Sequence, residues 1–425
     1  MITTASERHA ALSATPNSNA TQTMFEFRRQ PFKALYLLYA AIAILFIRLP
    51  YWLIISALPW TRPRRSWPMS RALIVHAMNA VVDVLYATSA TEEISPEKDA
   101  AAPEKTGFVW VEAVPDHLVQ GDVAAMARVN NVVPVKVWGY WLGKRTADGK
   151  YGQKAALSER VLYHLHGGGY TRGTGSPKSP TAAVPQGILD QCAGFVDRAF
   201  CVDYRLSSAP PFTPRNPFPA ALIDALSGYL YLIERAGFKP ENIILSGDSA
   251  GGHLAVALTR YLITLNDPTL TLPGATILAS PTVDWACTHD DLDSASMQTN
   301  ARSDFVSVIL KSGYSARGLL GNLPWGDLAI DPYLSPASLK IPEPSGLFSC
   351  YPPTCIVVGG AEQTRDPMRT LRDRIIADTA TSNLYYLEYE DAFHDFLGVT
   401  LHEPERSMAF KEIHAWLKDV MLDSC

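Results

Sequence analysis

The chain has 425 residues, with 37 Lys or Arg against 42 Asp or Glu, which gives a formal net charge of −5. Hydrophobic residues make up 47% of it and charged residues 19%, so it can bury a full core, and a disordered, collagenous or disulfide-framework protein is excluded. Residues 1–90 hold nine basic and three acidic residues, so a basic front end precedes an acidic body, and the weak overall charge argues against a nucleic-acid partner.

The apolar run over residues 34–60 contains a single charge, Arg48. It exceeds the ~20 residues that cross a hydrocarbon core, begins too late for a secretory signal and lacks a following small-residue cleavage site. We therefore predict a disordered N-terminus at 1–33 and a membrane anchor at 34–60. Arg48 and Pro50 leave two geometries open, a tilted single span and a re-entrant hairpin turning at Arg48-Leu49-Pro50. The predicted location is a membrane, that of the endoplasmic reticulum, with lipid as a partner and the side undetermined.

Residues 61–106 are predicted to form an amphipathic cap helix and a linker. Ser70 is placed to cap a helix over Arg71–Tyr86, whose apolar residues recur every three or four positions. Such a helix lies on a membrane or covers a pocket. Residues Ala90–Thr106 are rich in Ala, Glu, Pro and Lys, a composition typical of a mobile connector.

Residues 107–425 alternate β-rich runs with helical stretches, which predicts one α/β domain whose mostly parallel sheet carries helices on both faces. In such sheets the active residues follow the carboxyl ends of strands. Eight strands are predicted, at Phe108–Val114, Val133–Leu142, Val161–His166, Ala199–Tyr204, Asn242–Ser246, Ala275–Ala279, Thr354–Gly359 and Leu384–Tyr389. Helices are predicted at Pro217–Ala236, Gly251–Leu265, Asp304–Leu319 and Met368–Thr379.

The first motif after a predicted strand is His166-Gly167-Gly168-Gly169-Tyr170. Consecutive glycines leave their backbone N–H groups unshielded by side chains, as an oxyanion hole requires. Alone, the motif is equally compatible with a phosphate-binding loop or a plain turn. The sequence has no G-x-x-x-x-G-K-[ST] motif and no dinucleotide fingerprint, which disfavours a nucleotide site.

A second motif, Gly247-Asp248-Ser249-Ala250-Gly251-Gly252, joins a predicted strand to a predicted helix. A serine with a glycine two residues to either side at such a turn is the pattern of a nucleophile elbow, which exposes the Ser249 hydroxyl above the sheet. The N–H of Ala250 and the positive end of the helix dipole then lie near a developing oxyanion. The competing interpretation is a glycine-rich turn without chemistry.

A serine nucleophile needs a base, and the base needs an acid that orients it, in the chain order serine, acid, histidine. Among ten histidines, His394 follows the last predicted strand, where such a base is expected. Two carboxylates compete for the acid. Glu362 lies nearer the end of its strand and is favoured, and Asp366 is the alternative.

The six cysteines include neither a Cys-x-x-Cys pair nor a Cys/His grouping at metal-ligand spacing, so we expect no metal. Cys350 and Cys355 are candidates for a disulfide, but nothing else in the sequence supports one. Reduced buried thiols are the favoured interpretation.

These motifs resemble the hormone-sensitive-lipase-like branch of the α/β-hydrolase fold, which includes arylacetamide deacetylase and fungal esterases. The resemblance covers about Val133–Cys425 and extends to Val202-Asp203-Tyr204-Arg205-Leu206 and Asp331-Pro332-Tyr333-Leu334-Ser335-Pro336. It implies an α/β-hydrolase fold with an N-terminal helical cap that shapes the acyl pocket. It further implies a serine that attacks a carboxylic ester, an oxyanion held by the HGGG backbone and the residue after the serine, and no cofactor.

The chain departs from this family at the acid. The family commonly has an Asp-Pro-Leu-Arg-Asp run where this chain has Glu362-Gln363-Thr364-Arg365-Asp366. Matching the last two residues puts Glu362 in the place of the catalytic acid. A slipped alignment matches Asp366-Pro367-Met368-Arg369 instead and keeps Asp366 open.

The sequence thus predicts a membrane-anchored serine hydrolase that cleaves small to medium apolar carboxylic esters. The predicted site consists of Ser249, His394, Glu362 or Asp366, and the oxyanion residues Gly167, Gly168, Gly169 and Ala250 beside the motif residue His166. One alternative is a deacetylase or amidase of acetylated sterols or secondary metabolites. Another is a non-catalytic ligand receptor built on the same scaffold. The oligomeric state is not predicted.

Overall fold

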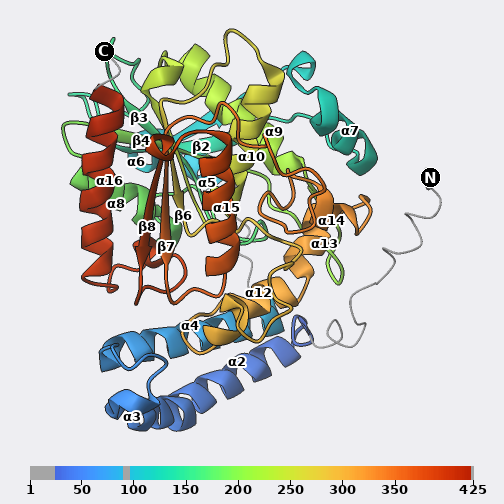
Figure 1. The fold of residues 1–425 in the computed structure, drawn as a ribbon, viewed down its shortest axis with the longest axis vertical. Helices are drawn as coiled ribbons and strands as arrows, with labels where there is room; N and C mark the ends of the chain where they lie inside the picture. Colours follow the sequence, from blue (N-terminus) through green and yellow to red (C-terminus); the bar gives the residue numbers. More distant parts are fainter. Residues whose placement is uncertain (1–23, 90–95, 423–425) are drawn as a thin grey trace.

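The computed structural model describes residues 24–89 and 96–422, and one mixed sheet of eight strands runs through the centre (Figure 1). The strand order is β1-β2-β4-β3-β5-β6-β7-β8; β2 pairs antiparallel with β1 and β4, and the remaining pairs are parallel. All eight predicted strands are present. Their bounds are β1 Phe108–Val111, β2 Val137–Gly143, β3 Val161–Leu165, β4 Arg198–Asp203, β5 Ile243–Asp248, β6 Ala275–Ala279, β7 Thr354–Gly359 and β8 Leu384–Tyr389.

Two strand boundaries differ from the prediction in an informative way. β2 begins at Val137 rather than Val133, and the lost part contains Pro134, which has no N–H to offer the ladder. β5 continues through Asp248, so Ser249 is the first residue beyond the strand. The candidate nucleophile therefore lies directly at the carboxyl end of a central parallel strand.

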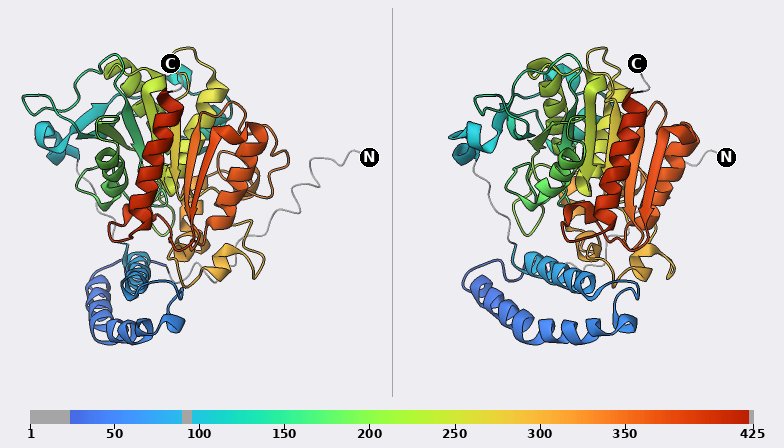
Figure 2. Two further views of the ribbon diagram at one scale, coloured as in Figure 1. Left: turned by 60° about the vertical axis from the view of Figure 1, so that its left-hand side comes forward. Right: turned by 90° about the vertical axis from the view of Figure 1, so that its left-hand side faces the viewer.

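Helices cover both faces of the sheet, as predicted (Figure 2). On one face, Ile413 and Leu417 of α16 join a core with strand residues such as Ile277. On the other, Leu254 and Leu371 belong to the larger core. The first face carries α8 Ala183–Gln191 and α16 Glu405–Leu422, and the second carries α9 Ala220–Leu230, α10 Ala250–Leu265 and α15 Arg365–Asp378.

The helix predicted over Asp304–Leu319 is wrong as a single element. It is divided into α12 Ser307–Lys311 and α13 Tyr314–Leu320. Gly313 between them has a φ of +64°, a left-handed conformation that ends one helix and begins the next.

The mobile connector predicted over Ala90–Thr106 is also wrong for its described part, whereas residues 90–95 lie outside the described residues. Residues 96–106 form two short helices, α5 Pro96–Ala100 and α6 Pro103–Thr106, beside β1. Asp99 accepts a hydrogen bond from the Tyr140 hydroxyl at 3.1 Å and pairs with Lys178. Composition suggested mobility here, but these tertiary contacts hold the segment on the sheet.

The described residues contain several further short elements. The α-helices are α7 Gly121–Asn130, α11 Ser296–Thr299 and α14 Asp327–Ile330. Single turns of 3-10 or π helix are η2 Pro59–Thr61, η3 Asp116–Leu118, η4 Pro180–Ala182, η5 Tyr231–Arg235, η6 Pro240–Asn242, η7 Thr381–Asn383 and η8 Phe396–Gly398.

The apolar run forms one continuous helix, Phe32–Ala57, made of α2 Phe32–Ala43, the π turn η1 Ile44–Arg48 and α3 Leu49–Ala57. The backbone stays right-handed helical at Arg48 and Leu49, so the re-entrant hairpin predicted as one alternative is wrong. Pro50 would clash with the carbonyl one turn earlier in a regular helix, and the wider π turn absorbs this. Within the described residues, this is the one helix whose length and composition are those of a membrane anchor or signal sequence.

The predicted cap helix is present as α4 Met69–Thr88. Ser70 does not cap it, because the helix begins after Pro68, whose extended backbone precedes the first turn. Residues 24–31, predicted to be disordered with the rest of 1–33, pack against the end of α4, where the Phe25 N–H donates to the Tyr86 carbonyl at 2.7 Å. Residues 1–23 of that prediction lie outside the described residues.

One buried ion pair fixes α4 to the body. The Arg71 guanidinium contacts both carboxylate oxygens of Glu405 on α16, at 2.8 and 2.5 Å, and donates to the carbonyls of Asp391 and Glu403. We expect Arg71→Met to lower the free energy of unfolding by about 3 kcal/mol, because it leaves a partly buried carboxylate without its partner. Urea denaturation followed by fluorescence measures this change.

The control is the double variant Arg71→Met/Glu405→Leu, which removes both charges. It should regain a large part of the lost stability, since no unpaired charge is left behind. A double variant as unstable as the single one would show that the hydrogen bonds to the carbonyls, and not the ion pair, hold α4.

Candidate active site

The sequence-predicted site residues meet at the carboxyl ends of the parallel strands. Ser249 follows β5, Glu362 follows β7 and His394 follows β8. Ser249 has φ +50° and ψ −116°, a strained conformation for a non-glycine residue that places it at the sharp turn between β5 and α10. Gly247 and Gly251 allow this turn, because a Cβ on Gly251 would lie 2.0 Å from the Leu165 carbonyl oxygen.

Three side chains form a hydrogen-bonded chain. The Ser249 hydroxyl lies 2.9 Å from Nε2 of His394, and Nδ1 of His394 lies 2.9 Å from Oε2 of Glu362. The imidazole and the carboxylate are buried, whereas Ser249 is half-buried and lines a pocket. A serine, a histidine and a carboxylate in this order allow a proton to move from the hydroxyl to the imidazole while the carboxylate stabilises the resulting cation.

The two candidate acids occupy different places. Oε1 of Glu362 accepts hydrogen bonds from the Ser280 hydroxyl and the Gly359 N–H, both at 2.6 Å, which leaves Oε2 directed at His394. Asp366 lies in the first turn of α15, where it accepts from the Ser296 N–H at 2.7 Å and pairs with Arg365. The structure therefore brings Glu362, and not Asp366, to the histidine.

The environment of His394 favours its protonated form. Burial by itself lowers the pKa of the imidazole, but the hydrogen bond and charge of Glu362, together with the charges of Asp304 and Asp248, raise it above its ordinary value. A proton taken up from Ser249 is therefore held on His394 more readily than on an isolated histidine.

Sequence patterns missed Asp304. It is fully buried, and its carboxylate accepts hydrogen bonds from the N–H groups of Gln363 at 2.7 Å, Phe305 at 2.9 Å and His394 at 3.3 Å. Burial raises the pKa of this carboxyl to about 7. Asp304 thus ties the loop of the acid to the loop of the base. Its signal was weak because it lies at the start of a predicted helix, where aspartate is an ordinary cap.

Gly167 and Gly168 of the His166–Tyr170 loop have no room for a side chain. A Cβ on Gly167 would lie 2.2 Å from a carboxylate oxygen of Asp248, and one on Gly168 would lie 2.2 Å from the Arg172 carbonyl oxygen. Gly168 and Gly169 have positive φ angles. These glycines and Ser249 line the same pocket, and Ala250 is the first residue of α10, where N–H groups lack an intrahelical acceptor. The four predicted oxyanion residues thus gather around Ser249.

His166 itself holds this loop in place. Its ring stacks on Tyr204 at 4.2 Å between centroids, and its carbonyl accepts the Tyr204 hydroxyl at 2.6 Å. Burial lowers the pKa of His166, although Asp203 opposes this. The buried His166 ring thus supports the loop and is not among the residues that line the pocket of Ser249.

The pocket above Ser249 has a volume of about 630 Å³. One wall is α4, and another is the segment around α12, which adds Phe305. Apart from the polar groups near Ser249, the pocket is lined mainly by aliphatic and aromatic side chains: Met78, Val82, Leu85, Tyr86, Trp285, Phe305, Val306, Ile309 and Leu310. It can accommodate a ligand with an apolar part of moderate size.

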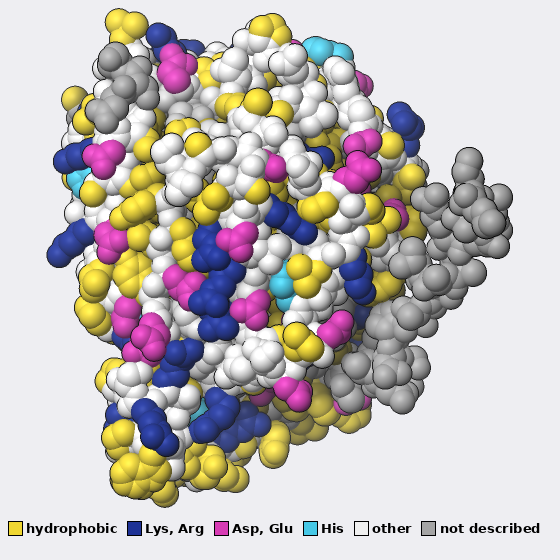
Figure 3. Space-filling view, viewed as in Figure 1, with side chains coloured by type: hydrophobic (Ala, Val, Ile, Leu, Met, Phe, Trp, Pro, Cys, Tyr) yellow, Lys and Arg dark blue, Asp and Glu magenta, His cyan; other side chains and the backbone are white. Residues whose placement is uncertain are grey.

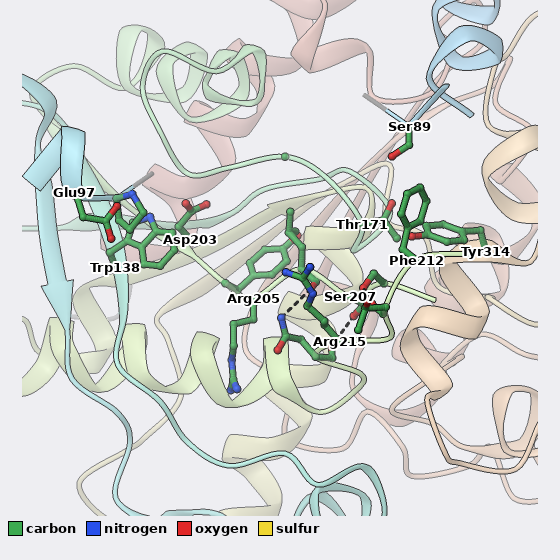
Figure 4. A pocket seen from close by; sticks show the side chains of 17 residues that line it. Ser89, Glu97, Trp138, Thr171, Asp203, Arg205, Ser207, Phe212, Arg215 and Tyr314 are labelled. Carbon is green, nitrogen blue, oxygen red and sulfur yellow. Dashed lines mark hydrogen bonds between the residues drawn. The ribbon is translucent and has the colours of Figure 1, made fainter. Parts of the chain in front are cut away.

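A second hollow, of about 680 Å³, shares lining residues with this pocket. Figure 4 shows the side chains that line this second hollow. It is more polar, with Asp203, Arg205 and Arg215 among its lining residues. Gly173, in the segment after β3, and Leu206, in the loop after β4, line both hollows, so these two segments lie between them. Ser249 and His394 line the first hollow and not the second, so the chemistry of the predicted residues belongs to the first.

The five described cysteines, Cys192, Cys201, Cys287, Cys350 and Cys355, are free thiols, whereas Cys425 lies outside the described residues. Burial raises the pKa of the Cys192 thiol to about 12. No group of three or more His, Cys, Asp or Glu side chains suited to a metal ion occurs in 24–89 or 96–422.

Comparison with known proteins gives a consistent result. The sequence profile of the alpha/beta hydrolase fold matches residues 162–398. An acetyl-hydrolase of Streptomyces hygroscopicus is 32% identical over 61% of this chain and 75% of its own length. An esterase of Acinetobacter venetianus is 28% identical over 63% of this chain and 78% of its own length.

Solved structures agree on the fold. An esterase/lipase from an uncultured bacterium superimposes with a TM-score of 0.54 at 24% identity, covering 83% of this chain and 98% of that one. The structure of EstE5 soaked with p-nitrophenyl butyrate gives a TM-score of 0.53 at 25% identity, with the same coverage.

The two candidate acids are distinguished by the pKa of His394. We expect Glu362→Gln to lower this pKa, because burial is then opposed only by the weaker influence of Asp304 and Asp248. Asp366→Asn serves as the matched control and should leave it unchanged, since Asp366 lies at Ser296. NMR titration of histidine-labelled protein measures both. If the pKa of His394 fell in the Asp366 variant and stayed unchanged in the Glu362 variant, Asp366 and not Glu362 would be the acid that pairs with His394.

Proposed function

The chain belongs to the alpha/beta hydrolase fold family and is a carboxylesterase-like hydrolase, and we propose that it cleaves apolar carboxylic esters with Ser249, His394 and Glu362. The observation that carries this proposal is the hydrogen-bonded chain of these three side chains, of which Ser249 and His394 line an apolar pocket. The serine, the base and the acid follow the chain order of such hydrolases.

In the first half-reaction the Ser249 hydroxyl oxygen attacks the ester carbonyl carbon while Nε2 of His394 takes the hydroxyl proton. Glu362 holds Nδ1–H and stabilises the imidazolium. The N–H groups of Gly167, Gly168 and Ala250 then stabilise the oxyanion of the tetrahedral intermediate, with Gly169 shaping the loop. Collapse of the intermediate breaks the ester C–O bond, and the His394 proton passes to the departing alcohol.

In the second half-reaction water replaces the alcohol. His394 takes a proton from the water molecule as its oxygen attacks the acyl-enzyme carbonyl, and the same N–H groups hold the second oxyanion. The C–O bond to Ser249 then breaks, and the proton on His394 returns to the serine oxygen. The acid is released and the site is restored without a cofactor.

The pocket supports small to medium apolar esters as the substrate class. The pocket has a volume of about 630 Å³ and mainly aliphatic and aromatic walls, so burial of a hydrocarbon group in it is favourable. The charged residues that line the pocket are Arg172, Asp248 and Asp395. The Arg172 guanidinium lies 4.7 Å from the centroid of the Tyr86 ring. The hydrocarbon that covers most of the walls favours an apolar acyl or alcohol group.

For the organisation of the chain we propose residues 34–60 as a membrane anchor, 61–106 as the cap helix and its link, and 107–425 as the catalytic domain. The helix Phe32–Ala57, with 11% of its most apolar window buried in the protein, supports the anchor. The endoplasmic reticulum is the proposed membrane.

We expect Ser249→Ala to lower kcat for p-nitrophenyl butyrate by at least about 10⁴-fold, because no other group supplies the nucleophile. The variant should also lose labelling by a fluorophosphonate probe while it keeps its far-UV circular dichroism. Ser307→Ala is the matched control, since this serine lies outside the pocket, and it should retain both properties. Full activity of the Ser249 variant would overturn the proposal, and absence of probe labelling in the wild type would favour a receptor.

The pH dependence follows from His394, which must be neutral to accept the serine proton. Because its pKa is raised, kcat/KM should fall as the pH drops through a value above the ordinary 6.5 of histidine. In Glu362→Gln this limb should move to lower pH while kcat falls by roughly 10³–10⁴-fold. Stopped-flow ester hydrolysis between pH 4 and 9 measures both; a limb at the same pH in the two proteins would contradict the role of Glu362.

A further inference from the structure

The helix Phe32–Ala57 presents a long apolar surface to solvent. Its mean hydropathy is 2.0 over the most apolar window, and few of its side chains are buried in the protein. Figure 3 shows hydrophobic side chains covering the end of the molecule where Figure 1 places α2 and α3. The large exposed side chains of this apolar face are Phe32, Leu35, Leu37, Leu38, Tyr39, Ile42, Leu45, Phe46, Ile47, Tyr51, Leu53 and Ile54, followed by Leu58 and Trp60.

Basic residues border this apolar face. Residues 24–68 contain seven Lys or Arg and one acid, Glu26. Arg29 and Arg65, which flank the helix at its two ends, are exposed, as is Arg302 of the body, which donates to the Thr61 carbonyl at 2.7 Å. Such a border attracts anionic headgroups. It also repels the same surface of a second copy, which a symmetric pair would bring face to face.

The helix is attached to α4 along its whole length. Near its start, the Lys33 ammonium donates to the Ser89 carbonyl; near its middle, Arg48 lies 3.8 Å from Asp83. Further along, the Trp52 ring stacks on His76 at 5.6 Å between centroids. The two helices therefore lie side by side, as all views show (Figures 1 and 2).

The other side of α4 belongs to the body and to the pocket. Ala72, Val75 and Tyr86 enter the main core, and Met78, Val82 and Leu85 line the pocket of Ser249. A helix crossing the bilayer would have to leave α4, or else carry α4, the Arg71–Glu405 pair and the pocket wall into hydrocarbon. Carrying α4 and the Arg71–Glu405 pair into hydrocarbon is costly, because charged and polar groups would leave water. Separating the helix from α4 would break every contact described above.

We propose that the helix Phe32–Ala57 lies in the plane of an anionic lipid surface with its apolar face immersed, and that it does not span the membrane. Arg48 then lies at the headgroup level beside Asp83 rather than at mid-bilayer. α4 then has the lipid surface on one side and the pocket on the other, so an apolar ester dissolved in the membrane lies close to the pocket of Ser249. This last point rests on the proposed function, whereas the orientation of the helix does not.

The orientation is tested with epitope tags at both ends of the full-length protein in sealed microsomes treated with protease. A helix lying in the plane puts both tags on one side, so the two tags are digested together or protected together. A span puts them on opposite sides. Detergent-opened microsomes are the control and should lose both tags. Opposite fates of the tags would overturn the proposal.

Lipid binding is tested with purified protein and sedimented vesicles of phosphatidylcholine and phosphatidylserine at 7:3. The variant Leu38→Glu/Phe46→Glu/Ile54→Glu places charges on the apolar face and should lose at least tenfold in vesicle binding. The matched control is Leu157→Glu/Leu292→Glu/Leu401→Glu, which adds the same charge at exposed leucines of the body and should bind as the wild type does. Equal binding of the two triple variants would overturn the proposal, as would a stable wild-type dimer that ignores vesicles.

Activity separates this proposal from the proposed function. Hydrolysis of water-soluble p-nitrophenyl acetate should be within twofold of wild type in both triple variants, because the altered residues lie outside the pocket. Hydrolysis of a long-chain ester carried in the vesicles should fall at least tenfold in the first variant alone. A wild type that binds vesicles with both tags on one side but hydrolyses neither ester would refute the proposed function and leave the orientation standing. Normal hydrolysis of the vesicle ester by the first variant would refute delivery from the membrane.

Discussion

The Glu362 carboxylate is fully buried, and the rest of the site is arranged to satisfy it. A buried carboxylate is costly unless its oxygens are hydrogen-bonded, and Glu362 receives bonds from Ser280, Gly359, Thr364 and His394. These partners come from the ends of β6, β7 and β8, so one carboxylate connects three neighbouring strand ends. Ser249, at the end of β5, joins through His394. The register of the parallel strands thus sets the distances among Ser249, His394 and Glu362, the nucleophile, base and acid of the proposed function.

Asp304 shows that the loops as well as the side chains are positioned. It binds the backbone of Gln363 and His394, and so couples the acid's loop to the base's loop across the sheet end. The segment that contains Asp304 continues into α12, which lines the pocket. The geometry of the three side chains of the proposed triad and the shape of the pocket therefore depend on the same short segment.

Helix α4 connects this chemistry to the apolar front of the chain. One side of α4 lines the pocket and the other carries the helix Phe32–Ala57. The link Thr61–Pro68 returns to the loop before His394, where buried Trp67 donates to the Asp391 carbonyl at 2.9 Å. The front end is consequently part of the folded molecule, in contact with the site at two places. Because the apolar and basic front end contacts the body in this way, binding of the front end to a surface also places the pocket near that surface.

Much of the architecture followed from local patterns in the sequence. All eight strands and the positions of Ser249 and His394 after them were predicted, because strand periodicity and glycine turns are encoded by neighbouring residues. Other features were not. The break at Gly313 depends on its left-handed backbone, and the continuous helix through Pro50 depends on the π turn before it. The short helices over 96–106 depend on contacts with segments far away in the chain. The pattern of turn residues and apolar residues along the sequence does not indicate these contacts.

What the sequence by itself determined was the order of elements, the glycine-rich turns and the residue types able to carry out the chemistry, since each depends on a short stretch of backbone. What only the tertiary structure decided was which carboxylate meets His394 and how the apolar helix lies. Glu362 and Asp366 are four positions apart in one segment, yet Glu362 faces β6 and β8, whereas Asp366 lies in the first turn of α15 and accepts a hydrogen bond from the Ser296 N–H. Likewise, the apolar composition of the helix Phe32–Ala57 indicates only that it prefers lipid to water. How this helix lies against α4 is set by its contacts with Asp83 and His76. Both outcomes are long-range, because they depend on which distant surface each side of the segment packs against.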